Sequence, residues 1–339
     1  MVKLLGILLF SFAATFFAAV PFIDLLYKLK FQRRAETQKD IFGIITSIVN
    51  RLHGWKVGTP NGGGTLIILI TIILSAIFYQ LTQFALNATG WILYFTIVSF
   101  GLLGLYDDVR KFYGFEQAGA WGLRLRYKFV LQWILALIIG WLLYNQMNLS
   151  SIFIPVFGTE IELGKWFIAF AAFVIVSTTN AVNVTDGLDG LAVGLTIIAL
   201  SAFWILASAT AFGDVTLFIA VMIGSLLAFL YFNIYPARVW LGDTGALSLG
   251  AMLAVIALMI NSSLALPFVG LVFVIEIVSS LSQWVSKATR GGKKIFIAAP
   301  IHHHFEARGW DETKVTMRFW LAGAISAFLG LFIALLGKL

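Results

Sequence analysis

The stretch NAVNVTDGLDG at residues 180–190 lies between two apolar runs, 166–179 and 191–212, and this alternation is the pattern on which the fold depends. Its amides and carboxylates recur every third residue, at Asn180, Asn183, Asp186 and Asp189. At about 100° per residue, helical side chains at this spacing share one face. Polar groups between such runs are costly unless they face a partner, a cavity or an ion. Capping of a helix end is the alternative, but four polar residues at one spacing disfavour it. No basic residue lies within the stretch, so we expect a cation to balance the carboxylates.

Ten apolar runs indicate the fold class. Of the 339 residues, 60% are hydrophobic and 12% are charged, whereas a soluble domain carries about 25% charged residues. The runs approach or exceed the roughly 20 apolar residues that a spanning helix needs. They lie at 4–23, 65–86, 92–106, 129–144, 166–179, 191–212, 217–235, 246–260, 264–285 and 319–336. The first run lacks a small-residue cleavage site, which favours a retained span over a signal peptide. We therefore predict an all-α integral membrane protein of about ten transmembrane helices, with residues 1–339 forming a single polytopic membrane domain.

The basic residues predict the orientation of these spans. Of the 23 Lys and Arg residues, 20 fall in segments that follow odd-numbered spans. Because positive charge accumulates on the cytoplasmic side, both termini are expected outside. The cytoplasmic loops are then expected near 30–62, 107–128, 180–190, 235–245 and 286–318. This topology also explains the net charge of +7, and no nucleic-acid partner is expected. The chain has no cysteine, which excludes disulfides and thiolate metal sites.

Candidate functional residues cluster in these segments. Asp107 and Asp108 end the third apolar run, and Lys111 follows them. Paired carboxylates suit Mg²⁺ binding or proton acceptance, although a solvated helix end is the favoured interpretation of this pair taken alone. Lys128 opens the next run, where it is also expected as a headgroup anchor.

The first loop contains a glycine-rich segment, GTPNGGG at 58–64, preceded by Lys56. Consecutive glycines let backbone amides approach an anion closely, but they also suit the start of a tightly packed span, and the two interpretations have equal weight. Upstream, apolar residues within 41–52 recur at helical spacing, which suggests a helix lying in the membrane interface.

The last two loops contain the remaining candidates. Trp240 and Asp243 lie between small residues, and Trp240 is either a stacking surface or the more common interfacial anchor. Glu276 lies inside the ninth run and must face the protein interior. The segment PIHHHFE at 300–306 contains His302, His303 and His304, three of the four histidines. Histidines alone are compatible with Zn²⁺, but the aspartates and basic residues favour Mg²⁺ with phosphate.

All these clusters lie on one side of the predicted membrane. A transporter places its site near the midplane between repeats, so this class is disfavoured. An enzyme and a non-enzymatic lipid or metal carrier both remain compatible with the residues.

Taken together, the motifs resemble the polyprenyl-phosphate N-acetylhexosamine-1-phosphate transferase superfamily. The resemblance extends from Lys56 to the last apolar run, with the motifs in the family's order. They are Asp107-Asp108 with Lys111, NAVNVTDGLDGLA at 180–192, Gly242-Asp243, and PIHHHFE at 300–306. The triple histidine is the most discriminating motif, because relatives that use UDP-N-acetylglucosamine typically have Ile-His-His there. The resemblance is therefore closest to members that use UDP-MurNAc-pentapeptide.

The resemblance implies transfer of phospho-MurNAc-pentapeptide from UDP-MurNAc-pentapeptide to undecaprenyl phosphate, with Mg²⁺, giving lipid I and UMP. It also implies a bacterial cytoplasmic (inner) membrane location, contact with membrane lipid and a homodimer. A transferase for another UDP-N-acetylhexosamine is the alternative.

The resemblance further implies the role of each residue. The catalytic set is Asp107, Asp108, Asp243, His302 and His303. Asp243 is the principal Mg²⁺ ligand, with Asp107 and Asp108 nearby and Asp107 as the candidate base. The substrate-binding set is Lys56, Asn61, Lys111, Lys128, Asn180, Asn183, Asp186, Trp240 and His304. The family usually has Thr-Pro-Thr-Met-Gly-Gly where this chain has TPNGGG at 59–64, a departure that concerns the contacts of the first loop.

Overall fold

A computed structural model describes residues 2–32, 54–82, 86–113, 125–209 and 212–336. The expected interfacial helix within 41–52 and His53 lie outside these residues. The elements, in chain order, are α1 (Val2–Lys28), η1 (Gly54–Lys56), α3 (Gly64–Leu81), α4 (Ala88–Tyr113), α5 (Leu125–Gln146), β1 (Ser151–Ile154), β2 (Thr159–Glu162), α6 (Trp166–Thr185), α7 (Leu191–Ala209), α8 (Gly213–Asn233), α9 (Gly242–Met259), α10 (Leu266–Val269), α11 (Leu271–Thr289), α12 (Ile301–Ala307) and α13 (Glu312–Leu336).

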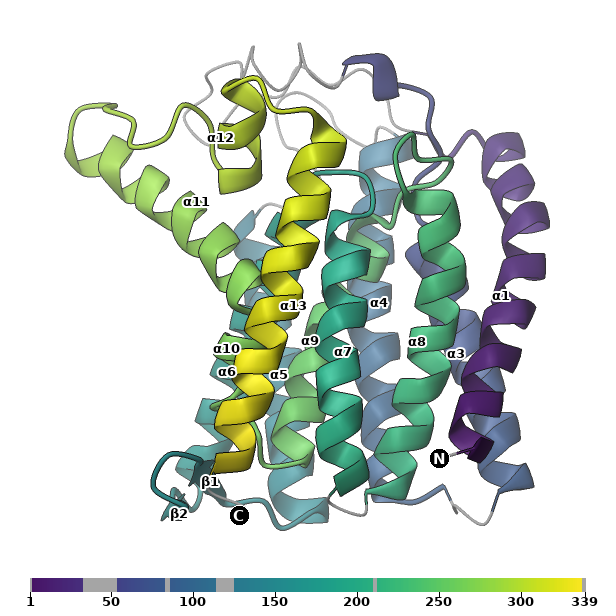
Figure 1. The fold of residues 1–339 in the computed structure, drawn as a ribbon, viewed down its shortest axis with the longest axis vertical. Helices are drawn as coiled ribbons and strands as arrows, with labels where there is room; N and C mark the ends of the chain where they lie inside the picture. Colours follow the sequence, from purple (N-terminus) through teal and green to yellow (C-terminus); the bar gives the residue numbers. More distant parts are fainter. Residues whose placement is uncertain (1, 33–53, 83–85, 114–124, 210–211, 337–339) are drawn as a thin grey trace.

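Ten of these helices, within the described residues, are long and apolar enough to cross a membrane, which confirms the predicted number. They are α1, α3, α4, α5, α6, α7, α8, α9, α11 and α13. The two chain ends lie at one end of the bundle, and η1 and α12 lie at the other end (Figure 1). We call the end that carries η1 and α12 the loop end.

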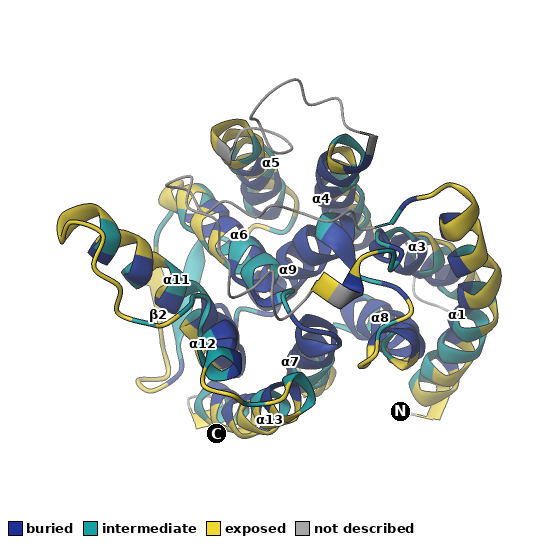
Figure 2. Ribbon diagram, turned by 90° about the horizontal axis from the view of Figure 1, so that it is seen from above, coloured by how far each residue is buried: buried dark blue, intermediate teal, exposed yellow. Residues whose placement is uncertain are grey.

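Helix α9 is the centre of the bundle. It is almost entirely buried, and the other helices surround it in the view from above (Figure 2). It packs along α4 and α6. The outer helices α1 and α13 instead expose large apolar side chains, among them Phe17 and Phe328. In a membrane protein such surfaces face lipid, so the polar residues of this bundle must be sought around α9.

Glycine allows α4 to lie directly against the start of α9. A Cβ atom added to Gly104 would lie 2.2 Å from the carbonyl oxygen of Asp243. Small residues permit such close helix contacts in membranes. One turn beyond Gly104, Asp108 therefore reaches the first turn of α9.

Several helix boundaries differ from the sequence expectation. Helix α4 continues beyond residue 106 to Tyr113, and α6 continues beyond residue 179 to Thr185. In both cases polar residues that face α9 remain helical, because their partners lie on α9 rather than in solvent. The run at 264–285 is divided at Gly270 into α10 and α11, and α11 leans away from the bundle (Figure 1).

A two-stranded hairpin, β1 and β2, lies at the end of the bundle that carries the chain ends (Figure 1). Its strands are antiparallel, with Ser151 opposite Glu162. Asn261, just beyond α9, accepts a hydrogen bond from the Phe153 amide at 3.1 Å and donates one to Glu160, also at 3.1 Å. This hairpin was not expected from the apolar runs, since it is too short to produce one.

Candidate active site

Asp108 of α4 caps the N-terminus of α9. Its Oδ1 accepts the backbone N–H of Asp243 at 3.2 Å, and its Oδ2 accepts the backbone N–H and the hydroxyl of Thr244 at 3.0 and 2.7 Å. A carboxylate at a helix N-terminus satisfies free amides and complements the helix dipole. Asn61 donates to Asp108 Oδ1 at 3.2 Å, so the first loop joins the same junction. Asp108 thereby fixes the position of Asp243.

Asp243 is held by two lysines and one amide. Its Oδ2 lies 2.8 Å from Lys111 Nζ and 2.5 Å from Lys128 Nζ. Its Oδ1 accepts a hydrogen bond from Asn183 at 3.1 Å. Both lysines also contact Asp107 Oδ2, at 3.1 and 3.0 Å. Four helices therefore converge on one carboxylate. We call Asp107, Asp108, Asp243, Lys111 and Lys128 the carboxylate–lysine cluster.

Asp107 and Asp108 are 3% and 1% exposed, so the interpretation of this pair as a solvated helix end is wrong. Asn180 lies deeper along α6 than Asn183. It donates to Gln132 Oε1 at 2.7 Å and to the carbonyl of Val176 at 2.8 Å. In this structure Asn180 joins α6 to α5, one turn from Lys128.

A buried triad of Lys56, Asp189 and Glu312 lies beside this cluster. Lys56 Nζ is 2.7 Å from Asp189 Oδ1 and 2.5 Å from Glu312 Oε1, and the Lys56 side chain is 1% exposed. Asp189 Oδ2 also accepts the Ala237 amide at 2.9 Å. The triad ties η1 to the loop before α7, the loop before α9 and the start of α13. The sequence predicted a cation beside Asp189. In the structure that positive charge belongs to Lys56, which lies 133 residues away in sequence.

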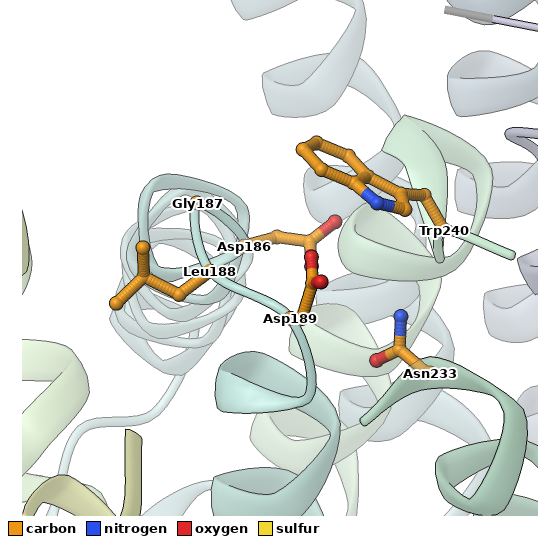
Figure 3. A pocket seen from close by; sticks show the side chains of 6 residues that line it. All are labelled: Asp186, Gly187, Leu188, Asp189, Asn233 and Trp240. Carbon is orange, nitrogen blue, oxygen red and sulfur yellow. The ribbon is translucent and has the colours of Figure 1, made fainter. Parts of the chain in front are cut away.

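Residues 186–189 and Trp240 line a narrow pocket together with Asn233 (Figure 3). The carboxylates of Asp186 and Asp189 lie side by side below the Trp240 ring, and Leu188 points away (Figure 3). Lys56 Nζ lies 5.1 Å from the centre of that ring. About 170 Å³ of empty space lies in and over the pocket, part of it open solvent, and it leaves no enclosed room for a ligand. A nucleotide therefore requires the pocket to open.

The pKa of Asp186 is raised to about 8, first by burial and then by the negative charges of Asp243, Asp108 and Asp189. The Lys56 ammonium opposes this rise. Burial is therefore the main cause of the elevated pKa, and the neighbouring carboxylates of Asp243, Asp108 and Asp189 add to it.

The histidines form the third part of the site. His302 Nδ1 lies 2.8 Å from Glu276 Oε2, and both side chains are fully buried, as expected for Glu276. His303 Nδ1 lies 2.7 Å from Glu306 Oε2. His304 Nδ1 accepts the Ile297 amide at 3.2 Å and so holds the preceding loop. The ring of His302 also contacts the turn at Gly187, which brings the histidines to the pocket.

The donor chemistry of the site fits Mg²⁺. Within the residues that the structure describes, no group of three or more His, Asp or Glu side chains is arranged as a metal site. Carboxylate oxygens are nevertheless the ligands that Mg²⁺ prefers, and a divalent cation would offset the negative charge of the neighbouring carboxylates. Asp243 is the candidate to hold it, with Asp107 and Asp108 nearby, and Asp243 would exchange a lysine contact for the ion.

The structure brings the predicted residues of all five loops to the loop end of the bundle. Sequence reasoning assigned no role to Thr244, Gln132 or Glu312, and it treated Asp189 only as one of the carboxylates that a cation balances. An acidic residue opening a helix was the only local signal for Glu312, and nothing local pointed to Gln132.

Comparisons with known proteins find a matching family and several similar chains. The family described as glycosyl transferase family 4 matches residues 90–261, which span the carboxylate–lysine cluster. The chain is 36% identical over 332 residues to the phospho-N-acetylmuramoyl-pentapeptide-transferase of Caldanaerobacter subterraneus subsp. tengcongensis, covering 97% of this chain and 98% of the relative. It is 37% identical over 334 residues to the protein of that name from Halalkalibacterium halodurans, covering 97% of each. It is 40% identical over 298 residues to the one from Rickettsia canadensis, covering 82% and 80%.

Proposed function

Since the chain belongs to the phospho-N-acetylmuramoyl-pentapeptide-transferase family, we propose that it transfers phospho-MurNAc-pentapeptide from UDP-MurNAc-pentapeptide to undecaprenyl phosphate, giving lipid I and UMP. Membership makes the chain an enzyme, a phosphoglycosyl transferase of peptidoglycan precursor synthesis, and sets aside the non-enzymatic carrier. The ten apolar helices make it a multi-pass membrane protein, and its relatives are bacterial.

The observation that supports this proposal best is the carboxylate–lysine cluster at the end of α9. The reaction brings two anions together, a phosphate monoester and a pyrophosphate. Lys111 and Lys128 are held at 2.5–3.1 Å from carboxylates of Asp107 and Asp243. Either ammonium group can exchange its carboxylate contact for a contact with a phosphate oxygen. Fixed positive charges that oppose charge on the reacting phosphates are the largest source of rate enhancement in such reactions.

In the proposed reaction, an oxygen of the lipid phosphate attacks the sugar-linked phosphorus of the donor. The bond from that phosphorus to the bridging oxygen breaks, and UMP leaves with the electron pair. A phosphate monoester has a second pKa of about 6 and is mostly ionised near pH 7. It therefore needs positioning more than deprotonation. We assign this task to Asp107, which holds both lysines, and favour direct attack over a covalent aspartyl phosphate.

Mg²⁺, when bound, would neutralise charge on the pyrophosphate and on the leaving UMP. We propose Asp243 as its principal ligand, with Asp107 and Asp108 nearby. Asp108 acts through the α9 N-terminus, because its bonds to the Asp243 and Thr244 amides keep Asp243 in place. Asn183 orients the other oxygen of Asp243.

The pocket under Trp240 is the proposed nucleotide site. An indole ring suits stacking on uracil, and Asp186 lies beside it (Figure 3). Lys56 lies under the same ring and is proposed to contact the donor when the pocket opens. Asn61 and Asn180 are proposed to support this site by holding Asp108 and α6. His303 and His304 are proposed on the sugar-peptide side, next to His302.

We further propose that the loop end faces the cytoplasm, with the chain in the cytoplasmic membrane and both termini outside. The excess of Lys and Arg in the loops of that end supports this orientation. The homodimer remains a proposal from the family resemblance, and chemical cross-linking in membranes tests it.

A two-donor assay tests the function. Membranes that contain the protein are supplied with undecaprenyl phosphate, Mg²⁺ and either UDP-MurNAc-pentapeptide or UDP-N-acetylglucosamine. UMP release is expected with the first donor, and release with only the second would refute the proposed substrate. Asp243→Asn is expected to abolish release, whereas Glu160→Gln, in the hairpin at the other end of the bundle, is the matched control and is expected to retain it.

A further inference from the structure

A buried acid–histidine pair lies where α11 meets α12. Glu276 of α11 and His302 of α12 are both 0% exposed, and Glu276 Oε2 lies 2.8 Å from His302 Nδ1. Ser279 fixes the same junction, because its hydroxyl donates to the Glu276 carbonyl at 2.7 Å and accepts the Ile301 amide at 3.0 Å. The pair is therefore held by the backbone of both helices.

Each side chain of the pair also has a second polar atom that makes no hydrogen bond to any described residue. Within the described part of the chain, Glu276 Oε1 and His302 Nε2 are buried and have no hydrogen-bond partner. His302 Nε2 faces Gly187, where an added Cβ atom would lie 2.3 Å away. Gly187 directly follows Asp186 on the wall of the pocket (Figure 3). An open ring nitrogen thus lies against the turn that carries Asp186.

Burial limits how the pair can be charged. A fully buried carboxylate without a cationic partner is strongly unfavourable, and among the described residues His302 is the one side chain that pairs with Glu276. A proton on Nδ1, donated to Glu276, and a second proton on Nε2 would make the two side chains a buried ion pair. In that state Nε2–H is a hydrogen-bond donor that calls for an anionic acceptor.

We propose that Glu276 is a positioning residue, which holds His302 as an imidazolium whose Nε2–H donates to a phosphate oxygen of the nucleotide-sugar substrate beside the Asp186–Gly187 turn. The substrate class rests on the proposed function. The charge of His302 is independent of that function, so the charge and the substrate class can be tested separately.

Nitrogen NMR tests the charge without turnover. Protein labelled with ¹⁵N-histidine in detergent micelles has four imidazoles, and loss of one signal set in His302→Asn assigns His302. Both His302 nitrogens are expected at imidazolium shifts at pH 7.5. In Glu276→Gln, which keeps an acceptor oxygen but no charge, one nitrogen is expected at a neutral, unprotonated shift. A neutral His302 in the unmodified protein, or an imidazolium that persists in Glu276→Gln, would overturn the proposal.

Kinetics test the positioning. By analogy with partners that orient metal-bound histidines, Glu276→Gln is expected to lower kcat by about 10- to 100-fold. The same change in a His302→Asn background is expected to cause no further loss, because Glu276 acts only through the ring. Independent, multiplying losses would refute this. Ser282→Ala is the control for α11 itself, because Ser282 lies six residues beyond Glu276 and bonds to the Ser279 carbonyl. This change is expected to leave kcat unchanged.

A second variant applies if Glu276→Gln does not fold. Gly187→Ala adds a methyl group against His302 Nε2, so kcat is expected to fall while the imidazolium signals persist. Unchanged kcat in Gly187→Ala would overturn the assignment of Nε2. If the unmodified protein shows no UMP release with any donor, the proposed function fails, and the NMR result still decides the charge of the pair.

Discussion

Replacing Lys56 by methionine tests whether the buried triad holds the loop end together. Methionine matches the length of the lysine stem but has no charge. The change leaves Asp189 and Glu312 buried side by side, since their side chains are 1% and 8% exposed. The Asp189 amide also donates to Glu312 Oε1 at 2.7 Å, so the two acids cannot separate without losing this bond.

The magnitude follows from this geometry. Removing one partner of a buried ion pair costs about 3–5 kcal/mol, because the other charge stays buried without compensation. Here one lysine serves two carboxylates, at 2.7 and 2.5 Å, so we expect the upper part of that range. Each 1.4 kcal/mol is a factor of about ten in the folded-to-unfolded ratio. Replacing all three residues by Met, Asn and Gln removes the two carboxylate charges as well and is expected to recover most of the loss.

Unfolding by SDS in mixed micelles, followed by the fluorescence of the 11 tryptophans, measures these changes without substrate. Lys314→Met is the control, because Lys314 is exposed and contacts the Trp310 ring at 5.1 Å; its midpoint is expected to stay unchanged. Equal midpoints for Lys56→Met and the unmodified protein would refute the reasoning. So would a triple variant that is no more stable than Lys56→Met.

Three further predictions follow from single contacts. Thr244→Val keeps the shape of the side chain but removes its 2.7 Å bond to Asp108; a loss of about 1–3 kcal/mol is expected in the same unfolding assay, with reduced UMP release, and full activity would contradict the role of Asp108. Gly104→Ala places a methyl group 2.2 Å from the Asp243 carbonyl and is expected to destabilise the bundle by about 1–3 kcal/mol or more, whereas Gly6→Ala, with no atom within 4 Å, is the neutral control. Asp186 has a pKa raised to about 8 from 3.8, so the folded protein binds an extra proton between these values; without divalent cations the contribution of Asp186 to stability is expected to be full below pH 4 and lost as pH rises to 8. The other buried carboxylates of the site also affect stability as pH changes, so Asp186→Asn is expected to make the decline smaller, and a decline of equal size in the variant would contradict the assignment to Asp186.

The spans could be predicted from the sequence because partitioning into a membrane depends on local composition. Ten apolar runs became ten candidate membrane helices. Where the apolar runs predicted a helix end wrongly, polar residues within the helix were the cause. Asp107 and Asn180 appeared to end a helix, yet each lies within one, since the polar face of α4 or α6 lies against α9 or α5 rather than in water. The break at Gly270 was hidden because both of its sides are apolar.

The sequence by itself determined the membrane class and the number of spans, and through motif resemblance it predicted the residues of the site. Only the tertiary structure decided which contacts each of those residues makes. Asp107 and Asp108 are adjacent in sequence, but one faces two lysines and the other caps α9, because neighbouring helical residues point about 100° apart. The stretch 180–190 lacks a basic residue, and the partner of Asp189 is Lys56, 133 positions earlier. Such pairings depend on which helices pack together, which no local pattern contains.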